Sequence, residues 1–231
     1  MKRNHSLSAL SLAVAAGVAG AGSLASAFPF LYSWHQASDG QRAGGGGIYG
    51  TGGAQDFNLG CSHCHVQGAG TIDATITPSP AWQLLAGQSA YVPGQKYTIT
   101  VKLVGEHKGL GQGNNNLNGM AMTFEDGAGR ATGFLASDVS GNDQSTCPAT
   151  APATNPPSPA TTYLYGPAKN CKTVVYNPLP NLTSWTFSWT APAAGTGAVT
   201  GFYGVVDGDS DGKSSLDDDV KMGTVKLAEG K

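Results

Sequence analysis

Charged side chains are scarce in this chain, and neither sign dominates. The 231 residues include 13 lysines and arginines and 15 aspartates and glutamates, for a formal net charge of −2. Proteins that bind nucleic acid usually carry a clustered excess of basic residues that neutralises phosphates. We therefore expect no nucleic acid partner.

Apolar runs that could cross a membrane are missing after the N-terminus. The chain starts with Lys2 and Arg3, continues with an apolar stretch at residues 7–21, and reaches Ala-Ser-Ala at residues 25–27. This order is typical of a signal peptide, with cleavage after Ala27. Since no cysteine follows to take a lipid and no sorting tail is present, we expect an exported protein, periplasmic or extracellular, without a transmembrane segment.

Patterns of catalytic residues are also missing. The sequence suggests no catalytic triad, no paired-carboxylate hydrolase site and no phosphate-binding loop. We expect no turnover of a substrate.

Only four cysteines occur, and two of them form the one motif that indicates a chemistry. Residues 61–65 read Cys-Ser-His-Cys-His, which is the attachment signature of a covalent c-type haem. The spacing places both sulfurs on one side of a turn, where Cys61 and Cys64 can each form a thioether with a haem vinyl group. His65 then becomes the proximal ligand of the iron.

Two other interpretations of this motif remain open. One is a redox disulfide between Cys61 and Cys64, and the other is a zinc site that uses both cysteines with His63 or His65. Zinc needs four ligands in a tetrahedron, and these four residues lie too close together in sequence to reach one ion comfortably. The spacing favours haem.

The remaining cysteines, Cys147 and Cys171, are predicted to form a disulfide because export exposes them to an oxidising compartment. The residues between them are rich in proline, which excludes a central strand. Closing a loop of this length stabilises a fold by roughly 3 kcal/mol in the chain-entropy model.

The sixth ligand of the haem iron decides whether it carries electrons or binds a small ligand. We expect His107, which lies in a polar segment bounded by glycines, to supply it. Met120 and Met122 are alternatives, but their spacing of two within a strand pattern is typical of core residues. His35 could fold back onto the haem, and His63 could bind a haem in a second chain.

An acidic segment at residues 207–218 resembles the start of a calcium loop. Asp207, Asp209 and Asp211 occupy positions 1, 3 and 5, and a glycine follows at position 6. Asp218 stands at position 12, where a glutamate is preferred. The segment therefore predicts either a calcium site or a solvated acidic turn.

The rest of the sequence predicts an all-β fold. Residues 28–90 read as a glycine-rich leader that carries the motif, and a β pattern begins at Tyr91, where apolar residues alternate from 97 to 103. Short strands separated by Gly, Pro, Asn and Asp indicate an antiparallel β-sandwich of immunoglobulin-like architecture. Further strands are predicted at residues 120–124, 173–176, 184–189 (with Trp185, Phe187 and Trp189 on one face), 199–206 and 222–227.

The order of several short segments resembles the reelin-type (Reeler) domain. These segments are Tyr-Val-Pro-Gly-Gln-Lys-Tyr-Thr-Ile-Thr-Val at 91–101, Gly-Phe at 133–134, Trp-Thr-Ala-Pro at 189–192, residues 197–203, and the Gly/Asp-rich turn after them. The chain is similar to secreted bacterial relatives in which a Cys-x-x-Cys-His segment precedes such a domain. The resemblance implies a Reeler-like sandwich at residues 91–231. Such relatives often end in a C-terminal anchor, and we expect none here.

Two functions from different classes follow. The first is an exported monohaem c-type cytochrome-like protein that carries single electrons on a β-sandwich scaffold, with a redox protein or another copy of itself as partner. The alternative is a secreted β-sandwich adhesion or ligand-binding module in which the motif is structural or sensory. A covalent haem carries redox chemistry of its own, which favours the first.

Overall fold

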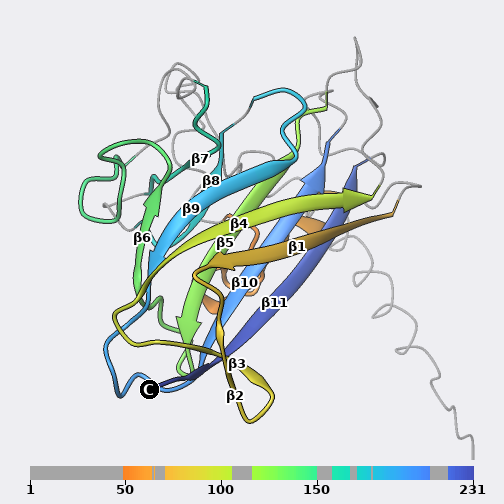
Figure 1. The fold of residues 1–231 in the computed structure, drawn as a ribbon. Coiled ribbons are helices and arrows are strands. Elements are labelled where there is room, and N and C mark those ends of the chain that lie inside the picture. The colour runs from red at the N-terminus through yellow and green to blue at the C-terminus, as the bar shows by residue number, and fades with distance from the viewer. Residues whose placement is uncertain are drawn as a thin grey trace, which may run out of the picture.

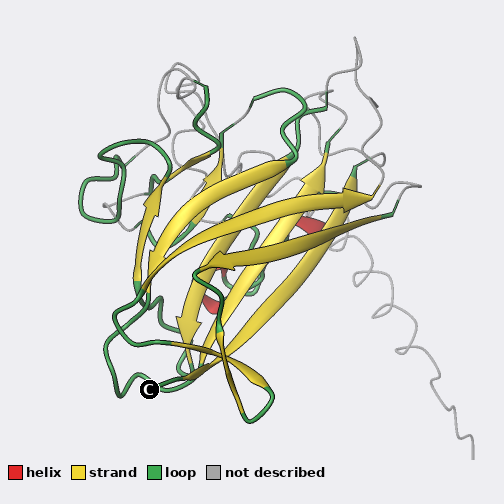
Figure 2. Ribbon diagram, in the orientation of Figure 1, coloured by secondary structure: helices red, strands yellow, loops and turns green. Residues whose placement is uncertain are grey.

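The computed structural model describes residues 49–63, 65, 71–105, 116–149, 158–166, 171–177, 179–208 and 218–231. In this part of the chain eleven strands form two sheets (Figure 1). Helical structure is limited to short 3-10 turns, as Figure 2 shows. The smaller sheet contains, in spatial order, β1 (Ile72–Ser79), β4 (Lys96–Gly105), β9 (Ser184–Thr190) and β6 (Phe134–Ser137).

The larger sheet has seven strands. Their spatial order is β2 (Gln83–Leu85), β3 (Gln88–Tyr91), β11 (Asp219–Glu229), β10 (Val199–Asp207), β5 (Gly119–Asp126), β8 (Val174–Tyr176) and β7 (Thr162–Tyr163). All pairings are antiparallel except that of β3 with β11. The predicted all-β, immunoglobulin-like sandwich is confirmed.

Alternating side chains of the two sheets form the core. Along β4, Tyr97, Ile99, Val101 and Leu103 are at most 2% exposed, as the period-2 pattern predicts. The opposing strand β5 contributes core residues at every second position, namely Met120, Met122 and Phe124. Both methionines are therefore ordinary core residues.

A cluster of aromatic rings closes one part of this core. Trp189 is fully buried and stacks on Phe124 with ring centroids 4.2 Å apart. Tyr91 contacts the same indole edge-on at 5.9 Å. The indole nitrogen donates a hydrogen bond to the carbonyl of Thr132, so its one polar group is satisfied within the fold.

All six strands predicted from the sequence are present, as β4, β5, β8, β9, β10 and β11. Three more, β1, β2 and β3, lie before or end at Tyr91. The pairing of β1 with β4 runs from Ile72 opposite Gly105 to Ser79 opposite Thr98. Alternating Ile72, Ala74 and Ile76 explain this strand, because they pack against the core between the sheets.

The disulfide between Cys147 and Cys171 is present, with the two Cα atoms 6.3 Å apart. Both cysteines are buried in the main core. The bridge thus connects the segment after β6, in the smaller sheet, to the segment before β8, in the larger sheet.

Candidate functional site

Residues 49–65, here called the motif segment, cover the outer face of the larger sheet, which is the face turned away from the smaller sheet. The short turn η3 (Ala54–Asp56) contacts β5, and η4 (Cys61–His63) contacts β10 and β11. In Figure 1 these turns, in orange, lie behind β5 and β10. Tyr49 packs with Ala121, Tyr165 and Val175 in a second, smaller apolar cluster. The Cys-x-x-Cys-His turn is therefore docked on the sandwich.

A buried carboxylate organises the first half of the motif segment. Asp56 accepts hydrogen bonds from the backbone nitrogens of Tyr49 at 3.1 Å and Thr51 at 2.9 Å, and from the Thr51 hydroxyl. Its burial raises the pKa of this carboxyl above the ordinary value, while the three hydrogen bonds oppose the shift. The loop is closed by a bridge between Thr51 and Gly60.

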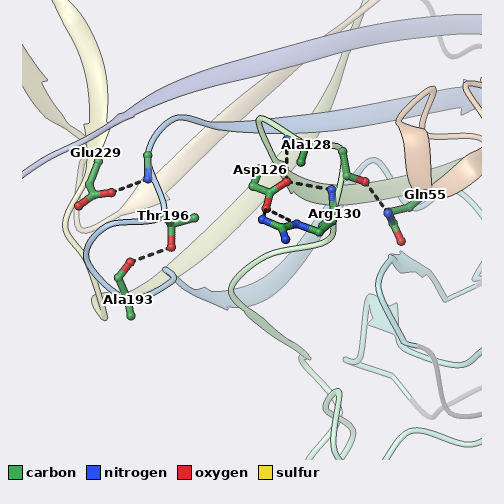
Figure 3. A network of polar contacts seen from close by, with 9 residues as sticks. Gln55, Asp126, Ala128, Arg130, Ala193, Thr196 and Glu229 are labelled. Carbon is green, nitrogen blue, oxygen red and sulfur yellow. Dashed lines mark hydrogen bonds and ion pairs between the residues drawn. The ribbon is translucent and has the colours of Figure 1, made fainter.

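Glu125 of β5 attaches this loop to the sheet. Its two carboxylate oxygens accept hydrogen bonds from the backbone nitrogens of Ala54 at 3.0 Å and Gln55 at 2.9 Å. The Gln55 side chain donates to the carbonyl of Gly129 at 2.5 Å, in the turn that Figure 3 shows beside Asp126 and Arg130. The Lys172 ammonium donates to the other end of the same amide at 2.9 Å. The start of the motif segment thus has polar attachments to three places in the sandwich.

Cys61 lies directly on a bare stretch of strand backbone. A Cβ atom built on Gly204 of β10 would lie 2.6 Å from Cys61 Sγ and 2.9 Å from the carbonyl oxygen of Gly50. Glycine at this position is therefore required by the close approach of the motif segment. The backbone nitrogen of Cys61 donates to the Gly50 carbonyl at 2.9 Å, which fixes the start of the turn. Met222 of β11 fills the space beside it, under Gly60.

His65 is held from the other side by the first residues of β11. Its backbone nitrogen donates to the carbonyl of Cys61 at 2.8 Å, and its ring Nδ1 lies 2.5 Å from Asp218 Oδ2. The Asp218 side chain is 3% exposed and the His65 side chain 35%. Where an ionised carboxylate faces a neutral imidazole, the carboxylate only accepts, so Nδ1 would be the donor and Nε2 would keep the lone pair that can bind a metal. This donor arrangement fits a haem iron at Nε2.

Tyr176 of β8 lies beside these groups. Its burial, with the negative charges of Cys61 and Asp218, raises the pKa of the phenol to about 12. The tyrosine is therefore neutral at physiological pH and adds no charge next to His65.

The other predicted ligands are placed differently. The ring of His63 turns back on its own loop, where its Nδ1 accepts from the backbone nitrogen of Gly60 at 3.0 Å. Buried Asp207 accepts from the Asn116 side chain at 2.6 Å, while Asp218 contacts His65. Several predicted features lie outside the described residues, namely the signal peptide at 1–27, His35, Cys64, His107, Asp209 and Asp211.

Neither a complete metal-binding group nor a membrane span is found in the described ranges. No three His, Cys, Asp or Glu side chains gather there to hold a metal ion. The same residues contain no helix that is long and apolar enough to span a bilayer. The calcium prediction for residues 207–218 stays a prediction, with two of its four carboxylates placed by the structure.

Sequence reasoning did not find the residues that position the motif. Gly204 and Glu125 gave no signal beyond their place in a strand pattern, and Asp218 was considered only as a calcium ligand. The contact between Asp218 and His65 joins residues 153 positions apart, so no local pattern announces it. Glycine inside a strand pattern is the one available signal, because it often marks a close approach of another backbone.

No family model matches this chain. A search of curated proteins finds no match either. Among solved structures, the chain is similar to the Reelin-N domain of F-spondin, with 14% identity and a TM-score of 0.44 over 74% of this chain and 96% of that one. It is also similar to the human F-spondin reeler domain, fragment 1, with 14% identity and a TM-score of 0.42 over 72% and 94%.

A third similar structure is that of AvmM, which catalyses macrocyclization in alchivemycin A biosynthesis. It has 14% identity and a TM-score of 0.30 over 69% of this chain and 90% of that one. Likenesses at these values carry no conclusion about binding or activity.

Proposed function

We propose that this protein is an exported β-sandwich binding module that carries a c-type haem covalently at the motif segment. Cys61 and Cys64 would hold the haem through thioethers, and His65 would bind its iron. The observation that carries the proposal is the 2.5 Å contact between His65 Nδ1 and Asp218 Oδ2. Histidines that bind metals usually donate their second ring nitrogen to such a carboxylate or to a carbonyl.

The attachment of the motif segment supports the same proposal. A cofactor site works best when its first contacts are held by well-packed supporting residues. Here Asp56 and Glu125 fix the loop before the cysteines, and Gly204 lets Cys61 approach the sheet. Zinc is less well supported, since Cys61, His63, Cys64 and His65 lie too close together in sequence to reach one tetrahedral ion comfortably.

The haem itself would supply one-electron chemistry or a binding position for a small ligand. The protein's residues attach it, orient His65 and provide a sandwich surface for a partner. We propose single-electron carriage if the iron has a second protein ligand, for which His107 remains the predicted residue. An open sixth position would instead make the module a sensor or binder of small ligands.

A second candidate function needs no haem. The half-buried Cys61 and its close approach to Gly204 also suit a turn whose purpose is to cover the sheet. The protein would then be an adhesion or ligand-binding module, and the motif would be structural.

A visible spectrum of the exported full chain, produced with a haem-maturation system, separates these candidates. The proposal predicts a c-type α band after dithionite and a pigment that stays with the protein in acidified acetone. A protein without a Soret band, or one that releases its pigment, would leave the haem-free module as the function.

Substitutions then assign the residues. Replacing Cys61 or Cys64 with alanine should abolish or weaken covalent attachment. The change His65→Ala should keep attached pigment but lose the low-spin spectrum, whereas His63→Ala is a matched control that should keep both. Equal spectra for the two histidine variants would remove His65 from the iron.

A further inference from the structure

We infer that Asp218 is a positioning residue for the haem iron, which orients the His65 ring and favours the oxidised state of the metal. This inference rests on the proposed function, because it assumes that His65 Nε2 binds iron. It assigns to Asp218 a role distinct from that of a calcium ligand.

The first support is the rigidity and burial of the carboxylate. Asp218 directly precedes β11, and the next residue, Asp219, pairs with Asp207 at the end of β10. With 3% of its side chain exposed, Asp218 is largely shielded from water and salt. Its backbone is tied to the sheet, so its oxygen is a fixed reference point for the histidine ring.

The second support is the chemistry of the contact. A neutral imidazole has one donor and one acceptor nitrogen, and a carboxylate at 2.5 Å from Nδ1 selects the form with the proton on Nδ1. In that form the lone pair of Nε2 faces away from the carboxylate and can bind a metal. The partly anionic character that a carboxylate gives the ring also makes it a stronger electron donor to a metal.

The third support is the charge that the contact brings to the proposed ligand. The carboxylate oxygen of Asp218 lies 2.5 Å from the ring of His65. A negative charge next to the axial histidine stabilises ferric iron relative to ferrous iron and lowers the reduction potential.

The test compares the haem-loaded wild type with Asp218→Asn and with the matched control Asp219→Asn. Asparagine keeps an acceptor oxygen of similar size but removes the charge. At one fixed ambient potential we expect the ratio of reduced to oxidised protein to rise about tenfold in Asp218→Asn, which matches the smaller losses of metal affinity or activity seen when such supporting residues are removed. A tenfold change corresponds to about 59 mV for one electron. The control, whose carboxylate is equally buried, should change the ratio less than twofold.

A second measurement separates this inference from the haem proposal. In the haem-free chain with both motif cysteines changed to serine, nitrogen NMR should show the His65 proton on Nδ1, and Asp218→Ala should move it largely to Nε2. The inference is overturned if wild type and Asp218→Asn have the same ratio of reduced to oxidised protein. It is also overturned if Asp218→Asn and Asp219→Asn change this ratio equally. A His65 proton on Nε2 in the haem-free chain that keeps Asp218 would overturn it as well. A wild type without covalent haem overturns the redox role and the proposed function together, whereas covalent haem with an unchanged ratio overturns only the role of Asp218.

Discussion

The two faces of the larger sheet follow different rules, although the same strands make both. On the inner face β5 presents a large apolar side chain at every second position, namely Met120, Met122 and Phe124. On the outer face the same strand presents Ala121, Thr123 and Glu125, and its neighbour β10 presents Gly204. The inner face depends on side chains that fill the core, whereas the outer face depends on individual residues that contact the motif segment. Stability should therefore depend chiefly on the first face, and the chemistry of the motif on the second.

The largest effect is expected in the core that the inner face helps to form, from Trp189→Ala on β9 of the smaller sheet. The indole is fully buried and stacks on Phe124, so its removal leaves a large cavity and should lower the free energy of unfolding by about 3–5 kcal/mol. Urea unfolding followed by far-UV circular dichroism measures the loss. Phe134→Ala is the matched control, since this aromatic residue of β6 is 40% exposed and should cost much less. Similar losses in both variants would contradict the packing described for Trp189.

The outer face should respond to a single methyl group at Gly204. In Gly204→Ala the new Cβ meets Cys61 Sγ and the Gly50 carbonyl, so the motif segment must shift. We expect a loss of about 1–3 kcal/mol in the free energy of unfolding and faster hydrogen exchange at the Cys61 amide. Gly127→Ala is the control, because a Cβ there has nothing within 4 Å. Unchanged exchange at Cys61 would show that the motif segment does not depend on this contact.

A smaller, pH-dependent effect is expected at Asp56. Burial raises the pKa of this carboxyl in the folded state, so the folded protein holds its proton to a higher pH than the unfolded chain does. Its contribution to stability is thus greatest at low pH and declines as the pH rises from the ordinary value through the folded pKa. The difference in the free energy of unfolding between wild type and Asp56→Asn should therefore decrease as the pH rises through these two pKa values. Urea titrations at a series of pH values measure this difference. A gap that widens with pH would mean that the three hydrogen bonds outweigh burial.

The smallest effect, of opposite sign, is expected at the exposed end of the sandwich. Glu229, seen in Figure 3 near Thr196 and Ala193, accepts hydrogen bonds from two backbone nitrogens. These are the nitrogens of Gly195 at 2.7 Å and Gly197 at 2.6 Å, and the two bonds lower the pKa of the Glu229 carboxyl. The ionised Glu229 therefore stabilises the fold at pH values above the ordinary pKa of glutamate. This stabilisation is lost as the pH falls through the pKa that Glu229 has in the folded protein. The change Glu229→Gln should lower the melting temperature slightly at pH 7 and not at acidic pH.

The uncharged change Thr196→Ala is the control for Glu229, because it removes a neighbouring hydrogen bond to the Ala193 carbonyl without removing a charge. Its effect should be the same at both pH values. An acid-dependent shift in this variant, or none in Glu229→Gln, would contradict the role assigned to the carboxylate.

The same contrast explains how far the sequence could be interpreted. Alternation in residues 97–103 and in Trp185, Phe187 and Trp189 reflects a local rule, so these strands and the side chains that they turn into the core were predictable. The motif was recognisable for the same reason, since its spacing lies within five residues. The residues to which the motif attaches were not predictable. Glu125, Gly204 and Asp218 are distant from the motif in sequence and contact the motif segment only through tertiary packing. Calcium at residues 207–218 and the iron ligand His107 stay predictions.

The position of the motif segment in the chain has a consequence for the order of events during export. Cys61 belongs to a part of the chain that is synthesised before its docking surface, because β10 and β11 follow it by more than a hundred residues. Until these strands are complete, the turn lacks the surface that half-buries Cys61. If the motif carries a haem as proposed, the haem would be attached most readily while the chain is still folding, and pairing of β10 with β11 would end that interval.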